Sequence, residues 1–481
     1  MMRRLVYEKF LSWKNRKNRK PLLVTGVRQC GKTYLIKEFG ANEFEEVAYF
    51  NFDGNEGLKS VFDYDLNIER IIDELGSIVY GKRIIPGKTL VVFDEVQDCP
   101  RAIQSLKYFC EDMPTLHLIA AGSLLGVALR GEGISFPVGK VDRIRMYPLN
   151  FEEFVRADGG DAFLEGLKKL PPTAEIPVLY AEPMKKFLRN YYIVGGMPEA
   201  VAGWIETHDY DEVDRIQNNI LEDYENDFSK HAQLRDVPKI RQIWKSIPEQ
   251  LAKENNKFVF SHVREGGRAR ELEDALEWLE DAGLVVKQNL IEKPELPLSY
   301  MADSTNFKIF MSDVGLLRKK ANVYYGTILN GDEKYIRFKG ALAENYVADE
   351  INLGMSGLMD PSTAPAVGRV RGAQYTMTGA ISLFYYEKKS RGIRIPLIGS
   401  STQTNTAYVM VEIRIIDNST SGVVYAMNKL GTAKRGTKGM TPLGDILIGA
   451  RDETEGGALS SAARNAVVQH VNAIKVMDWK D

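Results

Sequence analysis

Eight consecutive residues, Gly26 to Thr33, combine glycine, lysine and threonine at a spacing suited to phosphate chemistry. Gly26 and Gly31 can adopt backbone angles that are closed to other residues, so the loop between them can wrap around a polyphosphate and point its N–H groups inward. Lys32 supplies a positive charge for the outer phosphates, and the Thr33 hydroxyl is suited to a magnesium ion. The stretch therefore predicts a phosphate-binding loop.

The sequence on either side of this loop predicts the elements that would hold it in place. Residues 21–25 form a short apolar run typical of a buried strand, and residues 34–39 predict a helix whose positive dipole end faces the same anion. The spacing Gly-x-x-x-x-Gly-Lys-Thr is the P-loop pattern, which also occurs in ordinary Gly-rich turns. Because a strand precedes it and a helix follows it, we predict a nucleotide site that binds ATP and Mg²⁺.

Two more apolar runs predict neighbouring strands of a parallel sheet, and each ends in polar residues. Residues 89–93 lead into Asp94, which could hold magnesium, and Glu95, which could orient and polarise a water for attack on the terminal phosphate. Residues 116–121 lead into a Gly-Ser pair, where Ser123 could contact the terminal phosphate. The alternatives are two solvated carboxylates after one strand and a plain turn after the other.

Composition and charge limit the class of protein. The 481 residues predict two to four domains, and 27% charged with 44% hydrophobic residues is typical of a soluble globular protein. A net charge of −2 gives no global basic bias toward nucleic acid. Cys30, Cys99 and Cys110 are too few and too irregular for a disulfide framework or a zinc site, so we expect a reducing, cytoplasmic compartment. We see no secretory signal in residues 1–20 and no apolar run long enough to span a membrane.

The order of predicted elements indicates the domains. Over residues 1–155 strands alternate with helices, which predicts an α/β fold: a three-layer P-loop domain. Residues 156–255 read as a helical region. Residues 256–335 contain a helix with leucines at i, i+4 and i+7 followed by a hairpin, which is a winged-helix layout.

Two groups of arginines are candidates for contacts with phosphates. Arg264, Arg268 and Arg270 lie beside the winged-helix-like region and could touch DNA. Arg143 or Arg145 could reach the nucleotide of a neighbouring subunit in a homo-oligomer. For both groups, a solvated surface is the alternative.

Residues 4–350 together resemble the prokaryotic AAA-type ATPases that join a P-loop domain to a winged helix and a restriction-nuclease-like C-terminal domain. The resemblance rests on the P-loop and on residues 94–97, 122–123, 147–154, 195–199, 312–315 and 340–345. It implies ATP binding and hydrolysis, coupled to a conformational change that acts on DNA or a protein partner. A protein whose nucleotide site serves only as a switch for binding is the alternative.

The same resemblance predicts a nuclease-like sheet after about residue 350, with an Asp and a Glu-x-Lys motif that hold a metal ion. Glu344 stands where a first acid could lie, but residues 391–396 contain no carboxylate. Arg414 follows Glu412 where a lysine is expected. Since one acid cannot build a metal site, we expect no nuclease activity.

The composition changes beyond residue 350. Residues 351–481 carry 15 Lys and Arg against 10 Asp and Glu, a net charge of +5, whereas residues 1–350 carry 48 against 55, a net charge of −7. The pattern predicts β-ribbons over 375–386 and 407–417 joined by a Gly/Ser/Thr loop. It also predicts a strand over 423–427 and a final helix over 458–474.

Residues 356–481 resemble the C-terminal half of the curli-assembly lipoprotein (CsgG-like) domain. Residues 359–364, 371–381 and 415–424 carry this likeness. It implies an alternative function as an envelope or curli secretion component. Such proteins have a signal peptide and a lipidated cysteine, and we find neither here, nor the first half of that domain. We therefore expect a fusion whose seam lies within residues 336–355.

Overall fold

The computed structural model divides the chain into two compact units, which we describe separately. The first comprises Met1–Pro294 and Leu298–Ala364, and the second comprises Glu295–Pro297 and Pro365–Asp481. The residues whose structure is described are 2–128, 136–169, 177–253, 257–291, 302–330, 333–355, 375–395, 398–417 and 422–441.

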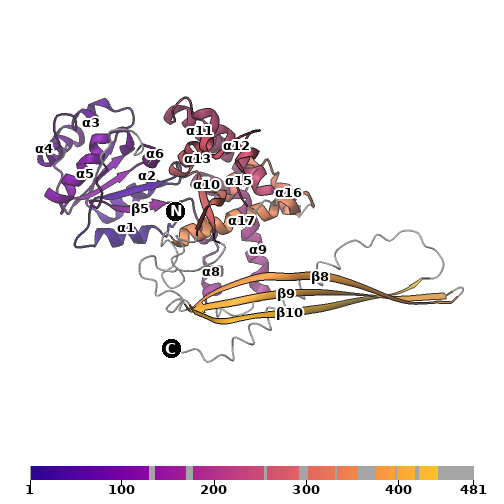
Figure 1. Ribbon diagram of the computed structural model, residues 1–481. Coiled ribbons are helices and arrows are strands. Elements are labelled where there is room, and N and C mark those ends of the chain that lie inside the picture. The colour runs from indigo at the N-terminus through magenta and orange to yellow at the C-terminus, as the bar shows by residue number, and fades with distance from the viewer. Residues whose placement is uncertain are drawn as a thin grey trace. The chain divides into compact units, whose positions relative to one another are not determined.

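A five-stranded parallel sheet forms the centre of the N-terminal part of the first unit (Figure 1). Its strands lie in the order β2-β3-β4-β1-β5. Their bounds are β1 Leu22–Gly26, β2 Glu46–Asn51, β3 Thr89–Asp94, β4 His117–Ala121 and β5 Asp142–Met146. Because β3, β4 and β1 are neighbours and run parallel, the residues that follow them meet at one edge of the sheet.

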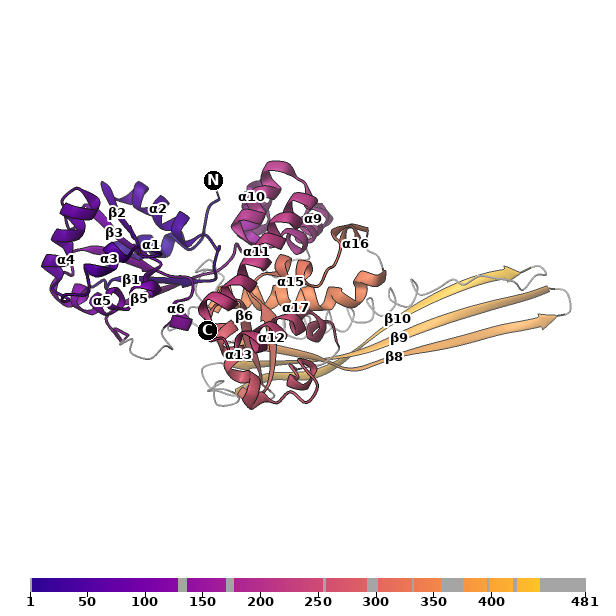
Figure 2. The same ribbon diagram turned by 90° about the horizontal axis from the view of Figure 1, so that it is seen from above.

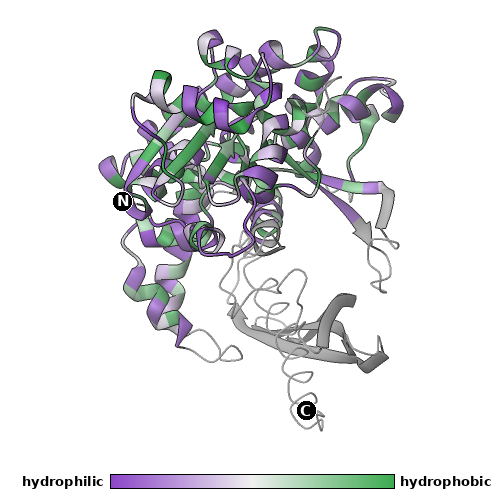
Figure 3. Cartoon of the chain, turned by 90° about the vertical axis from the view of Figure 1, so that its left-hand side faces the viewer, coloured by the Kyte–Doolittle hydropathy of each residue, from purple (hydrophilic) through white to green (hydrophobic). Residues whose placement is uncertain are grey.

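Alternate residues of these strands enter two separate hydrophobic cores. Val24 and Val92 face a core that contains residues of α1 (Tyr7–Lys14) and α2 (Lys32–Glu43). Leu23 and Val91 face a core that contains residues of α4 (Ile68–Glu74) and α5 (Pro100–Asp112). Figure 3 shows hydrophobic strands between helices that carry hydrophilic residues outward. The predicted three-layer α/β fold is therefore confirmed.

Short elements connect these layers. Asn150 begins α7 with a capping box, in which its side chain accepts from Glu153 N and the Glu153 side chain accepts from Asn150 N. The other short elements are α3 Glu56–Ser60, a π-helical turn Leu75–Tyr80, a 3-10 turn Val96–Asp98, α6 Leu125–Ala128, α7 Phe151–Ala157 and α8 Asp161–Lys168.

The rest of the first unit is mainly helical (Figure 2). Its core is continuous with the core under α1 and α2 and extends to Leu342. The helices are α9 Val178–Val194, α10 Pro198–Thr207, α11 Tyr210–His231, α12 Val237–Ala252, a 3-10 turn Phe260–His262, α13 Ala269–Asp281, α15 Val314–Lys320, α16 Tyr325–Asn330 and α17 Glu333–Met355. An antiparallel hairpin of β6 (Val285–Ile291) and β7 (Ala302–Met311) follows α13.

The predicted seam over residues 336–355 falls inside α17, which is a continuous helix of 23 residues. Phe338, Ala341 and Leu342 from this helix are buried in the core of the first unit. These three residues of α17 therefore pack with the first unit.

The second unit contains three long antiparallel strands, β8 (Tyr375–Ile395), β9 (Ile398–Asp417) and β10 (Gly422–Thr441), with β9 in the middle (Figure 1). The predicted Gly/Ser/Thr loop between residues 386 and 407 is wrong, because β8 and β9 stay paired up to Ile395 and Ile398. Threonine favours extended backbone, so a Thr-rich stretch can continue a strand. The predicted helix over 458–474 lies outside the described residues. Among the helices described, we find none with the length and apolarity that a membrane crossing requires.

Candidate nucleotide-binding site

The P-loop connects β1 to α2 at the edge where the strands end. Gly26 has φ 147° and Gly31 has φ 91°, which L side chains rarely adopt. A Cβ at Gly26 would also lie 2.2 Å from Met146 O. Lys32 folds back into the loop, where its Nζ donates to Gly26 O at 3.0 Å and Val27 O at 2.9 Å. The two glycines and the lysine are therefore fixed by the geometry of the loop itself.

Asp94 at the end of β3 meets Thr33 of the P-loop. The Thr33 hydroxyl donates to Asp94 Oδ2 at 2.7 Å, and the Tyr49 hydroxyl donates to the same oxygen at 2.6 Å. The Asp94 side chain is buried. Burial raises the pKa of Tyr49, and the hydrogen bond and charge of Asp94 raise it further, so Tyr49 stays a donor at neutral pH. The sequence indicates that Thr33 and Asp94 could both hold magnesium, but no local pattern indicates the contact of Tyr49 with Asp94.

Glu95 and Ser123 come together at the ends of β3 and β4. Glu95 has φ 50°, an uncommon backbone conformation for a residue other than glycine. Its Oε2 accepts from Gln97 Nε2 at 2.6 Å and lies 3.5 Å from the Ser123 hydroxyl. A Cβ at Gly122 would lie 2.3 Å from Gln97 Oε1, so glycine at this position admits the Gln97 side chain. Gln97 thus holds the Glu95 carboxylate, a role that no local sequence pattern indicates.

Arg4, near the N-terminus, anchors the outer side of the P-loop. Its guanidinium donates to Cys30 O at 3.1 Å, to Tyr147 O at 2.7 Å and to Glu153 Oε1 at 3.2 Å. The Arg4 and Glu153 side chains are both buried. Because such a pair loses hydration, its several hydrogen bonds make the geometry specific. The residues that cap α7 are therefore joined to the P-loop through one arginine.

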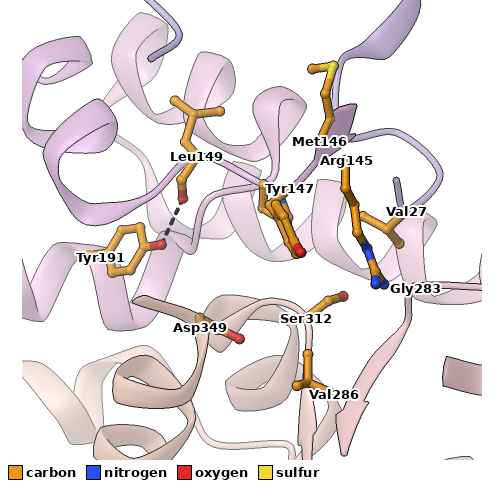
Figure 4. Close-up of a pocket in the computed structure, with 11 residues that line it drawn as sticks. Val27, Arg145, Met146, Tyr147, Leu149, Tyr191, Gly283, Val286, Ser312 and Asp349 are labelled. Carbon is orange, nitrogen blue, oxygen red and sulfur yellow. Dashed lines mark hydrogen bonds between the residues drawn. The ribbon is translucent and has the colours of Figure 1, made fainter. Parts of the chain in front are cut away.

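Three of the motifs on which the resemblance rests, residues 147–154, 195–199 and 312–315, are hydrogen-bonded to one another. Leu149 N donates to Gly196 O at 2.6 Å, and Gly196 N donates to Asp313 Oδ2 at 2.6 Å. The Tyr191 hydroxyl donates to Leu149 O at 2.7 Å (Figure 4). A Cβ at Gly196 would lie 1.9 Å from Leu149 O, so only glycine permits this approach. Three motifs far apart in the sequence thus form one hydrogen-bonded network.

Besides a cavity of ≈ 220 Å³ that Gly26 and Ser123 help to line, two others border the P-loop. One of ≈ 20 Å³, large enough for a single water, is lined by Val27, Tyr147, Gly283, Asp349 and other residues (Figure 4). The other has a volume of ≈ 510 Å³ and lies beside the start of α2. Its lining includes Gly31, Tyr34, Pro198, Ala202 and Ile205. This second cavity is mainly apolar and adjoins the phosphate loop.

α11 covers another side of the P-loop. Arg28 forms an ion pair with Asp227, and Gln29 Nε2 donates to Asp223 Oδ2 at 2.8 Å. The Tyr224 hydroxyl donates to Arg28 O at 2.9 Å. No local pattern in the sequence indicates these contacts, because they join residues almost 200 positions apart.

Arg143 and Arg145 line the cavity of ≈ 220 Å³ beside Gly26 and Ser123. Arg143 stacks on Phe136 with 4.5 Å from Cζ to the ring centre, and Arg145 lies over another ring, that of Tyr147, at 5.4 Å. Arg264 is paired with Glu271. In the part of the chain that the structure describes, no cluster of three or more His, Cys, Asp or Glu side chains could hold a metal ion.

Three family models match different parts of the chain. Residues 18–155 match an AAA domain, residues 185–324 match a domain of unknown function (DUF8612), and residues 345–481 match the curli production assembly/transport component CsgG. No curated protein matches the chain.

Solved structures similar to this chain include three proteins at low identity. They are the ORC2 protein of Aeropyrum pernix in complexes with ADPNP and ADP (16% identity, 68% of this chain and 91% of that one, TM-score 0.35) and AMPPCP-bound DnaA of Aquifex aeolicus (13%, 73% and 94%, TM-score 0.28). The third is PCH-2 of C. elegans (13%, 43% and 61%, TM-score 0.25). These TM-scores are too low to support an inference. The parallel sheet, the P-loop and the family match together identify residues 18–155 as an AAA-type P-loop domain.

Proposed function

We propose that this chain binds ATP with Mg²⁺ and hydrolyses it at the ends of β1, β3 and β4. The observation that carries the proposal is the meeting of Lys32, Thr33, Asp94, Glu95 and Ser123 at one sheet edge. These residue types supply what phosphoryl transfer needs, namely positive charge, metal ligands and an oriented water.

Each residue has a defined role in this proposal. Lys32 exchanges Gly26 O and Val27 O for the outer phosphates, while the P-loop N–H groups bind the same anion. The Thr33 hydroxyl and the Asp94 carboxylate, 2.7 Å apart, are hard oxygen donors that suit Mg²⁺. The ion would neutralise charge on the phosphates.

Glu95 holds the attacking water in this proposal. Gln97 fixes the Glu95 carboxylate at 2.6 Å, and the Ser123 hydroxyl lies 3.5 Å from the same oxygen, within reach of a terminal phosphate. The αL backbone of Glu95 turns its side chain away from the strand direction. Such positioning accounts for much of the catalysis expected in this reaction class.

The apolar cavity beside Gly31 and Tyr34 is the proposed site for the adenine base. Its walls come from both the P-loop domain and α10, so a bound base would contact the two regions at once. This position fits a ligand whose phosphates lie in the adjacent loop.

The helical region is the part of the chain that we propose to change conformation on ATP hydrolysis and to act on a partner. We interpret α12, α13 and the β6–β7 hairpin as a winged helix. α13 carries six acidic residues, Glu271, Glu273, Asp274, Glu277, Glu280 and Asp281, and one basic residue, Arg270. Because such a helix would be repelled by DNA phosphates, its charge favours a protein partner over DNA.

The chain's setting is also part of the proposal. Three free cysteines support a cytoplasmic location.

Arg143 and Arg145 are exposed on β5, an edge strand of the described sheet, where they could reach the nucleotide of another copy in a homo-oligomer. The CsgG match over residues 345–481 supports curli assembly as a second candidate function.

The variant Glu95→Gln tests the proposed hydrolysis. We expect it to keep ATP affinity and to lose turnover by about 10²- to 10⁴-fold, because it keeps the shape of Glu95 but not its charge. Steady-state phosphate release and a binding titration measure the two quantities, and Glu222→Gln, an exposed acid on α11, is the control. Equal loss of binding and turnover in Glu95→Gln would show that the role of Glu95 is assigned wrongly.

A further inference from the structure

Arg28 is a cation inside the P-loop to which the proposed reaction assigns no role. It lies two residues after Gly26, and its side chain is 43% exposed. The guanidinium is paired with Asp227 of α11, whose side chain is only 9% exposed. The Tyr224 hydroxyl holds the Arg28 carbonyl, so the backbone at this position is fixed independently of the ion pair.

Acidic side chains lie around Arg28. Burial alone would lower its pKa, but the hydrogen bond and charge of Asp227 raise it, with further contributions from Glu95 and Asp223. Glu95 is the residue proposed to hold the attacking water. Arg28 itself belongs to the loop proposed to hold the phosphates, between Gly26 and Lys32, and its side chain is half exposed and paired with Asp227.

We propose that Arg28 contacts the terminal phosphate of ATP, and that it leaves Asp227 to do so and thereby breaks one of the contacts that join α11 to the P-loop. This inference rests on the proposed ATP binding at the P-loop. A terminal phosphate offers Arg28 a multiply charged acceptor with several oxygens, which suits a guanidinium better than a single carboxylate does. The same phosphate would repel Asp227 and Asp223.

A change in the contact between α11 and the P-loop can also affect α15, because α11 is bonded to both. Asp214 of α11 accepts from Arg318 at 2.6 Å and from Lys319 at 2.9 Å, both of α15. Arg318 is fully buried and also donates to Gln217 of α11 at 2.5 Å. The N-terminal half of α11 is thus joined to α15 while its C-terminal half is joined to the P-loop. ADP lacks the terminal phosphate, so it would leave the Arg28–Asp227 pair intact.

Calorimetric titration of the full chain with ATPγS and with ADP, each with Mg²⁺, tests the exchange. Arg28→Ala should weaken ATPγS binding on the order of 10- to 100-fold, as expected for a charge-assisted hydrogen bond, and leave ADP binding unchanged. Arg28→Lys should recover part of the loss. Asp227→Asn should strengthen ATPγS binding roughly 3- to 10-fold, because it removes the competing carboxylate. Glu222→Gln should behave as the wild type.

Two results of the titration would overturn the proposal. One is an equal loss of ATPγS and ADP affinity in Arg28→Ala, and the other is unchanged ATPγS affinity in both Arg28→Ala and Asp227→Asn. The second readout is hydrogen exchange in the C-terminal half of α11, which should become faster with ATPγS but not with ADP. Unchanged exchange with ATPγS would contradict the proposed loss of the Arg28–Asp227 contact even if Arg28→Ala misfolds. Wild-type binding that Lys32→Ala abolishes would support ATP binding whatever Arg28 does. A wild-type chain that binds neither nucleotide would overturn both proposals.

Discussion

Asp313 joins the hydrogen-bonded network that includes Gly196 and Leu149. Its burial predicts how the stability of the protein depends on pH. Its side chain is buried, and its two carboxylate oxygens accept from Gly196 N at 2.6 Å and Leu316 N at 2.8 Å. Burial raises the pKa of Asp313 from 3.8 to about 6, although the backbone hydrogen bonds oppose this shift. The variant Asp313→Asn removes the titrating group and keeps one of the two acceptors.

The sign and the size of the effect follow from this shift. A carboxyl whose pKa is raised on folding contributes stability below its unfolded pKa, and this contribution is lost as pH rises through the folded pKa. The shift from 3.8 to about 6 corresponds to a loss of about 3 kcal/mol in the free energy of unfolding. Relative to Asp313→Asn, the wild type should therefore lose about this amount between about pH 4 and pH 6.5.

Urea unfolding followed by tryptophan fluorescence measures this difference. Trp244 is fully buried in the hydrophobic core that also contains Val314 and Leu316, which follow Asp313 in the sequence, so its fluorescence reports on the unfolding of this core. Asp313→Asn leaves one N–H without an acceptor, so we expect the variant to be less stable than the wild type at low pH. The difference between their free energies of unfolding should shrink as pH rises. Glu222→Gln is the control and should follow the wild type. Parallel pH profiles for Asp313→Asn and the wild type would refute the argument.

Two further predictions concern partners and domain structure. Fluorescence anisotropy should detect no salt-dependent binding of duplex DNA, because α13 is strongly acidic; binding at low salt that weakens when Arg268 and Arg270 are neutralised would contradict this. Limited proteolysis with mass mapping should show that residues 1–350 form a soluble fragment that binds ATP. Residues 356–481 alone should aggregate, since β8 and β10 are edge strands of the described sheet; a resistant tail fragment that melts cooperatively by itself would count against this prediction.

The sheet and the order of the candidate site residues could be predicted from local sequence. Continuous apolar runs identified β1, β3 and β4, and the polar residues after parallel strands must meet at one edge. This rule alone is enough to predict that Thr33, Asp94 and Ser123 lie at the same edge. The predicted helix after the P-loop was shorter than α2, because Gly40 and Ala41 lack the side chains that a periodicity argument uses.

Contacts between distant segments could not be predicted in the same way. Tyr49 and Gln97 complete the acid end of the site, but their roles depend on how β2 and the turn after β3 pack. The pairing of Arg28 with Asp227 depends on the placement of α11 in the tertiary fold. Local composition also gave a wrong prediction between residues 386 and 407. The expected loop is largely strand, because pairing with a neighbouring strand outweighs a Gly- and Ser-rich composition.

Equilibrium titration of a fluorescent ATP analogue with Mg²⁺ tests the central claim most directly, with the wild type and Lys32→Ala compared. Lys32 Nζ now bonds Gly26 O and Val27 O, and we propose that it exchanges these for the outer phosphates. We expect saturable binding by the wild type and by Lys17→Ala, an exposed lysine, and a loss of at least about 100-fold in Lys32→Ala. A thermal melt would verify that Lys32→Ala remains folded. Unchanged affinity in a folded Lys32→Ala protein would contradict the account.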